Sequence, residues 1–293
     1  MARVTHSHLA HRRNPARSPP KRFATGVEAR WHAWDAAPAT QHFNGRFRTS
    51  DGSSTPSITR VATFALVHGG LHGAWCWERL TPFLQQAGHA VVAMDLPIDD
   101  NTASFDTYAD AACAAVDECS DDLILVGHSY GGMVVPLVAA RRPVRHLVYL
   151  CAYVPDIGKS FADQMVSEPD MVNPASYAML KLDEQSRYVC AAPELVRALM
   201  YADCDESTVT AAITRLRPHS PYPNKLLCSL AEFPTVPCTS VVCTDDQCIG
   251  LDWAKRIARD RLGADLIELP GSHSPHLSRP SALADVLLHL AET

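Results

Sequence analysis

Apolar runs alternate with amphipathic segments from residue 61 to the end of the chain, and this pattern restricts the fold more than any other feature. The runs contain almost no polar residues, which is typical of strands buried on both faces of a parallel sheet. Amphipathic helices between such strands cover the two faces. We therefore predict an α/β fold with a mostly parallel, six-stranded sheet and helices on both faces. The predicted strands are residues 61–67, 89–97, 123–127, 144–154, 239–244 and 264–270.

Five segments with apolar residues every three or four positions are predicted to be the helices that cover this sheet. These predicted helices are residues 75–88, 108–119, 132–142, 252–262 and 281–292. The side chains expected to share one buried face of the first are Trp77, Leu80, Phe83 and Leu84.

The interval 156–237 interrupts the alternation of strands and helices. It contains a helical pattern at 192–201 and a proline-rich link at 217–225. A long insertion between two strands of a compact sheet usually covers an active site. We therefore predict an α/β domain over residues 59–293, with a helical cap insertion at about 156–237.

Residues 1–58 differ from the rest of the chain in composition. Residues 1–50 hold nine Lys and Arg residues but two acidic ones, and they show no sustained helical or strand period. We predict a basic, disordered N-terminal extension. Because the whole chain has a net charge of −6, the remaining residues are strongly acidic, which disfavours a nucleic-acid partner. No run of 18 apolar residues exists, so we expect no membrane span.

The ten cysteines show no C-x-x-C pair and no metal-site spacing. No secretory leader pattern precedes them, so we expect reduced thiols and a cytoplasmic protein. No G-x-G-x-x-G or P-loop motif is present, and we expect neither a cofactor nor a metal. The expected partner is a small molecule, and a homodimer stays open.

Reactive residues follow several of the predicted strands, and ligands of open α/β sheets bind at the carboxyl ends of strands. The stretch LILVGHSYGG places Ser129 in a G-x-S-x-G motif between a strand and a helix. In this nucleophile elbow the flanking glycines permit a sharp turn that exposes the serine hydroxyl. The motif therefore indicates a nucleophilic serine.

A glycine-rich loop, His68-Gly69-Gly70-Leu71, follows the first predicted strand. Such a loop can direct a backbone N–H toward the nucleophile and form half of an oxyanion hole. The N–H of Tyr130, directly after Ser129, would form the other half. His72 lies beside this loop, and we interpret it as structural.

A nucleophilic serine needs a base and a residue that orients the base. His273 follows the last predicted strand and is the first candidate, with His276 second. Asp245 and Asp246 follow the strand at 239–244, and Asp156 is the next choice for the acid. The order serine, acid, histidine is the order found in α/β-hydrolases.

Three stretches carry a resemblance to a known family: LVHGGLHGAWCWERLTPFLQQAGHAVVAMDLP, GHSYGG and GSHSPHLSRP. They resemble the α/β-hydrolases that include plant methyl-ester esterases, plant hydroxynitrile lyases and bacterial esterase relatives. The resemblance covers about residues 61–293.

The resemblance implies a Ser129–Asp246–His273 catalytic triad and an oxyanion hole formed by the backbone N–H groups of Gly70 and Tyr130. It favours Asp246 over its neighbour because TDDQCIGLDW is similar to the family's T-x-D-x-x-I-P stretch, with glycine in place of the proline. It also implies the helical cap.

Two departures from the family's sequence pattern reduce the set of reactions that we expect. The lyases carry a threonine in the oxyanion loop and a lysine after the catalytic histidine, whereas this chain has Gly69 and Ser274 there. Without that ammonium group, lyase chemistry is not expected. We therefore expect a carboxylesterase that cleaves small to medium uncharged carboxylic esters through an acyl-enzyme.

Two alternatives stay open. The same triad hydrolyses lactones, amides or C–C bonds, and some relatives are ligand receptors with slow turnover. A pocket for an apolar acyl or alcohol group is expected in the cap. The cap residues considered for its lining are Met165, Met171, Tyr177, Met179, Leu180 and Tyr201.

Overall fold

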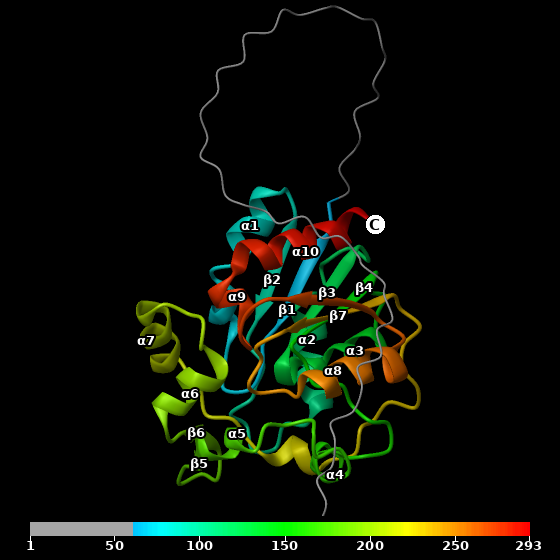
Figure 1. Cartoon of the computed structure of the whole chain (residues 1–293). Coiled ribbons are helices and arrows are strands. Elements are labelled where there is room, and N and C mark those ends of the chain that lie inside the picture. The colour runs from blue at the N-terminus through cyan, green and yellow to red at the C-terminus, as the bar shows by residue number, and fades with distance from the viewer. Residues whose placement is uncertain (1–60) are drawn as a thin grey trace, which may run out of the picture. The chain divides into compact units, whose positions relative to one another are not determined.

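The computed structural model of the chain describes residues 61–293 (Figure 1). The predicted extension, residues 1–58, lies outside the described residues. Six strands form one sheet in the order β2-β1-β3-β4-β7-β8, and every neighbouring pair is parallel. The predicted α/β class and six-stranded sheet are confirmed. The strands are β1 (Thr63–Val67), β2 (Ala90–Met94), β3 (Leu123–His128), β4 (His146–Leu150), β7 (Cys238–Cys243) and β8 (Asp265–Leu269).

Alternate residues of each central strand enter two separate cores, one on each face of the sheet. Phe64 and Leu66 of β1 pack in one core, while Ala65 and Val67 pack in the other. The first core is covered by α1 (Thr81–Gln86) and α10 (Pro280–Glu292). The second is covered by α2 (Phe105–Ala115), α3 (Val135–Ala139) and α8 (Leu251–Ile257).

Three of the predicted helices are each divided into two shorter elements in the structure. The segment 75–88 forms a 3₁₀ turn, η1 (Ala74–Trp77), and then α1, whose second residue is Pro82. Proline lacks the N–H that would continue a helix from the preceding turn. Phe83 is 39% exposed, so the prediction that it shares the buried face of Leu84 is wrong.

After Ser129 the chain forms a 3₁₀ helix, η2 (Ser129–Met133), and only then α3. The single helix predicted for residues 132–142 is therefore interrupted near Pro136. The segment 252–262 also changes character, because α8 continues into a π-helical turn, η4 (Ala258–Leu262).

The segment between β4 and β7 contains short elements. Its helices are α4 (Phe161–Ser167), α5 (Ala175–Ala178), α6 (Pro193–Met200), α7 (Glu206–Thr214) and the 3₁₀ turn η3 (Tyr222–Lys225). It also contains an antiparallel hairpin, β5 (Leu180–Leu182) with β6 (Tyr188–Cys190), which the sequence did not reveal. Figure 1 places these elements together at the carboxyl ends of the strands.

The strand order reverses between β1 and β3, because β1 is followed by an edge strand and β3 by strands on the other side. Loops leaving a sheet at such a switch point diverge and leave a crevice for ligands. The loops after β1 and β3 hold Gly70 and Ser129, so the sheet topology itself brings these two residues to one crevice.

Within residues 61–293, no helix has the length and apolar character needed to cross a bilayer.

Candidate active site

Ser129 lies at the tip of the sharp turn that joins β3 to η2. Its φ is +52°, in the left-handed region that non-glycine residues rarely adopt. A Cβ on Gly127 would lie 2.8 Å from the carbonyl oxygen of Gly131, and one on Gly131 would lie 2.6 Å from that of Val67. Both glycines are therefore required by the packing of the turn, as the elbow motif predicted.

His273 is hydrogen-bonded to both Ser129 and Asp246. Its Nε2 is 3.0 Å from Ser129 Oγ, and its Nδ1 is 2.9 Å from Asp246 Oδ2. Because a carboxylate only accepts, Nδ1 carries the proton and Nε2 is free to accept from the serine hydroxyl. The structure thus brings together all three residues that the sequence proposed as a triad.

Asp246 is held by the backbone that follows it. Its Oδ1 accepts the N–H groups of Cys248 at 2.7 Å and Ile249 at 3.1 Å, which leaves Oδ2 directed at His273. The side chains of Asp246 and His273 are 5% and 2% exposed, so water hardly competes for this pair. The carboxylate is therefore fixed in orientation before any ligand binds.

The other candidates for acid and base lie elsewhere. Asp245 is exposed, and its Oδ2 accepts the N–H of Gly271 at 3.2 Å. Asp156 pairs with Lys159 at 2.8 Å. His276 is fully buried, with its ring centroid 4.4 Å from that of His128. None of these side chains is hydrogen-bonded to Ser129, whose side-chain partner is His273.

Gly70 and Tyr130, proposed for the oxyanion hole, line the same cavity as Ser129 and His273. Tyr130 is the second residue of η2, so its N–H has no acceptor within that helix. The carbonyl of Gly70 is 2.8 Å from His72 Nδ1, which must donate because a carbonyl accepts. This bond fixes the peptide plane of the loop.

His72 links the glycine-rich loop to Tyr201 through its two ring nitrogens. Its Nε2 accepts the hydroxyl proton of Tyr201 at 2.8 Å, while burial lowers the pKa of the imidazole to about 3. His128 holds the backbone of His273 in place, since its Nε2 donates to the backbone oxygen of His273 at 3.0 Å. Burial also lowers the pKa of His128 well below its usual range. Both histidines stay neutral and position other groups.

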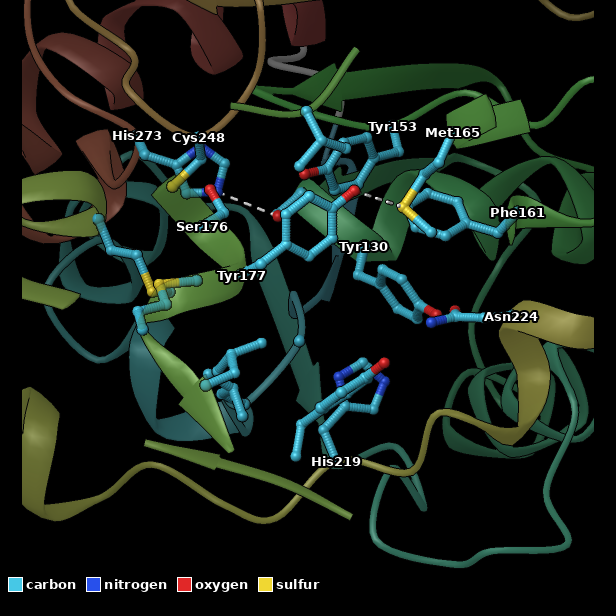
Figure 2. A pocket seen from close by; sticks show the side chains of 18 of the residues that line it. Tyr130, Tyr153, Phe161, Met165, Ser176, Tyr177, His219, Asn224, Cys248 and His273 are labelled. Atoms are coloured by element: carbon cyan, nitrogen blue, oxygen red, sulfur yellow. Dashed lines mark hydrogen bonds between the residues drawn. The ribbon is translucent and has the colours of Figure 1, made fainter. Parts of the chain in front are cut away.

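A cavity of about 350 Å³ lies beside Ser129 (Figure 2). That volume lies within the range of small-molecule sites. Side chains of the β4–β7 segment, many of them aromatic or sulfur-containing, form most of its wall, and His273, Cys248 and Ser176 lie together at one side of the view. The apolar residues among those that line it include Phe161, Met165, Tyr177, Met179, Leu180 and Met200.

Two residues considered for this lining, Met171 and Tyr201, are fully buried in the core instead and do not reach the cavity. Several lining residues were missed by sequence reasoning, among them the polar residues His219 and Asn224. Both belong to the stretch 217–225, which its prolines marked as a link. A polar residue in a proline-rich stretch carries no local signal that tertiary packing will direct it into a pocket.

Comparison with known proteins places the chain in a family. It matches the family model described as the alpha/beta hydrolase family over residues 64–286. It is 27% identical to Methylesterase 2 of Arabidopsis thaliana over 257 residues, which are 80% of this chain and 97% of that protein. It is 28% identical to the probable esterase PIR7A of Oryza sativa subsp. japonica over 254 residues, 78% and 96% of the two chains.

Among solved structures, a pyrethroid hydrolase from Sphingobium faniae superposes with a TM-score of 0.71 at 21% identity, covering 80% of this chain and 98% of that one. At this identity the likeness concerns the fold. The family match and the named relatives confirm the predicted resemblance and the prediction that the protein is a hydrolase. The chain belongs to the alpha/beta hydrolase family.

Proposed function

We propose that this protein is a serine carboxylesterase that cleaves small to medium uncharged esters. The observation that carries the proposal is the continuous chain of hydrogen bonds from Ser129 through His273 to Asp246, at the wall of an apolar cavity. The names of the relatives, a methylesterase and a probable esterase, support an ester as the bond that is cleaved.

In the first half of the reaction, Ser129 Oγ attacks the carbonyl carbon of the ester while His273 Nε2 takes the serine proton. Asp246 stabilises the imidazolium that forms. The tetrahedral intermediate then collapses, the carbon–oxygen bond to the alcohol breaks, and His273 returns the proton to the departing alkoxide. The acyl group remains on Ser129.

In the second half, a water molecule takes the place of the alcohol. His273 removes one proton from the water, whose oxygen attacks the acyl carbon. Collapse of the second intermediate releases the carboxylic acid and restores Ser129 with the proton held by His273. The enzyme ends in its starting state, with no group consumed other than ester and water.

The negative charge of each intermediate falls on the former carbonyl oxygen. We assign its stabilisation to the backbone N–H groups of Gly70 and Tyr130, which border the cavity next to Ser129. Loss of one such donor typically raises the barrier by about 2.7–4 kcal/mol. Because both donors belong to the backbone, side-chain substitution alone does not remove them.

The proposal is tested by turnover of p-nitrophenyl acetate and of methyl esters by the purified protein and its Ser129→Ala variant. We expect hydrolysis by the parent chain and a loss of several orders of magnitude in the variant, because removal of the triad serine of a serine protease costs on the order of 10⁶ in kcat. Comparable rates in the two proteins, or binding without product formation by the parent chain, would contradict the proposal.

A further inference from the structure

Four side chains that line the cavity each hold a buried polar atom without a hydrogen-bond partner: Tyr130 Oη, His219 Nε2, Asn224 Oδ1 and Ser176 Oγ. Ser176 lies on the side of His273 and Cys248, whereas Asn224 enters from the opposite side (Figure 2). Tyr130 and His219 are 8% and 6% exposed. Since buried polar groups of folded proteins are nearly always paired, a set of unpaired ones on a cavity wall indicates a missing ligand group.

His219 is fixed in place by its own backbone and by its neighbours. Its N–H and carbonyl exchange hydrogen bonds with Tyr188 at 2.9 and 2.7 Å. Its ring meets that of Tyr130 edge-on, with the centroids 4.7 Å apart. A Cβ on Gly70 would lie 2.8 Å from its Nδ1, so the other edge of the ring packs against the proposed oxyanion loop.

Asn224 comes from η3, a few residues after His219, so one stretch of chain supplies both side chains. In the view of Figure 2 the phenol of Tyr130 points toward the side of the cavity at which Asn224 enters. Together these three side chains form the polar end of the cavity, the name used for them below.

The polar end is uncharged. Burial lowers the pKa of His219 to about 3 and raises the pKa of the Tyr130 phenol well above its usual range. Lys181 also lines the cavity, but its side chain is exposed. A charged ligand group at the polar end would lose its hydration without gaining an opposite charge, and a purely apolar one would leave the three atoms unpaired.

We propose that the polar end selects esters whose apolar, ring-sized portion carries a neutral group that both donates and accepts hydrogen bonds, such as a carboxamide or a carbamate N–H. This inference rests on the proposed ester hydrolysis and names its substrate class. Asn224 Oδ1 accepts from the N–H of such a group, while the hydroxyl of Tyr130 and the ring nitrogen of His219 can satisfy its carbonyl.

The experiment compares three matched sets of methyl esters: arylacetates, 3-arylpropanoates and 4-arylbutanoates. Each set bears a para-carboxamide, a para-isopropyl group of similar shape or a para-carboxylate. The same aryl groups are also offered on the alcohol side, as acetates of the arylalkanols. We expect the carboxamide to give the highest kcat/KM of its set for at least one chain length, by roughly tenfold.

Asn224→Leu keeps the shape of the side chain and removes its amide, so we expect it to abolish the preference for the carboxamide over the isopropyl member of each set. Met200→Leu changes the cavity wall without changing a polar group and serves as the matched control, in which the preference should persist. If the leucine variant does not fold, Asn224→Asp is the second variant, because it keeps a polar side chain at this position. In that variant, we expect esters bearing an acceptor without a donor, such as a para-acetyl group, to be disfavoured.

Preference for the isopropyl or carboxylate member at every chain length on both sides of the ester overturns the inference. An undiminished carboxamide preference in Asn224→Leu does so as well. In either case the esters are still cleaved, so ester hydrolysis by Ser129 stands. Failure to cleave any ester instead contradicts the proposed function.

Discussion

At the scale of single residues, Asp246 and Asp245 are adjacent in sequence but occupy opposite environments. Asp246 is nearly inaccessible to water and accepts two backbone N–H groups on the oxygen that does not face His273. Asp245 is exposed. If Asp246 is the acid of the triad, removal of its charge should lower kcat far more than removal of the charge of Asp245.

We expect Asp246→Asn to lower kcat on the order of 10⁴-fold, the size of the same change in a serine protease triad, because an amide favours the wrong tautomer of His273. Asp245→Asn should retain kcat within a few-fold. Steady-state kinetics of both variants on one ester checks this prediction. Equal losses in the two variants would show that the acid has been assigned to the wrong residue.

The residues after the strands could be predicted from sequence because their position depends on local order. An apolar strand followed by G-x-S-x-G, or by an aspartate pair, places the side chain at the sheet edge whatever the rest of the chain does. His219 could not be predicted in this way. Its position depends on pairing with Tyr188, thirty-one residues earlier, and a pairing at that separation leaves no local pattern.

At the scale of elements, the connection from β3 to η2 depends on close contact between η2 and the chain after β4. The backbone N–H of Tyr153 donates to the carbonyl of Ser129 at 3.0 Å. A Cβ on Gly132 would lie 2.1 Å from the carbonyl oxygen of Tyr153, far inside contact distance. The atom it meets belongs to the backbone, which cannot rotate away as a side chain would.

We therefore expect Gly132→Ala to reduce the free energy of unfolding by about 3 kcal/mol or more, by overpacking. Gly263→Ala is the matched control: its φ is +58° but no atom lies within 4 Å of the added Cβ, so only the backbone cost of about 1–2 kcal/mol applies. Urea unfolding of both variants measures the difference. A Gly132 variant no less stable than the control would mean that this contact relaxes freely.

Strands were easier to predict than helices in this chain, and the reason is physical. The central strands β1, β3, β4 and β7 are almost wholly buried and mostly apolar, which is typical of strands in a parallel sheet, whereas the edge strands β2 and β8 are more exposed. Helices α1 and α3 each have a proline in their first turn, and such a detail shortens an element without changing its apolar spacing. The β5–β6 hairpin, with three residues in each strand, is too short to show a period.

At the scale of the whole molecule, the core contains an unusual number of buried, neutral histidines. Burial lowers the pKa of His68 to about 4 and those of His72 and His219 to about 3, and it lowers the pKa values of His128 and His276 well below the usual range. In the unfolded chain these residues bind protons near pH 6.5. Between those limits the unfolded state holds more protons than the folded state.

The free energy of unfolding should therefore be unaffected by the protonation of these histidines above pH 6.5. It should decline as the pH falls from 6.5 toward 4, by up to about 1.4 kcal/mol per pH unit for each such histidine. His276→Phe removes one of them without breaking a side-chain hydrogen bond, since neither ring nitrogen has a partner. Urea midpoints at several pH values test both statements. Stability that is unchanged from pH 6.5 to 4.5, or an equally steep decline in the variant, would contradict them.

The proposed catalytic residues and most of the cavity wall come from different parts of the chain. Ser129, Asp246 and His273 follow strands of the sheet, whereas most of the cavity wall comes from the segment between β4 and β7. Natural selection can thus redirect such a protein to new esters by altering that segment while the chemistry is inherited unchanged. A protein engineer could do the same with a mutant library confined to α4, α5 and the β5–β6 hairpin.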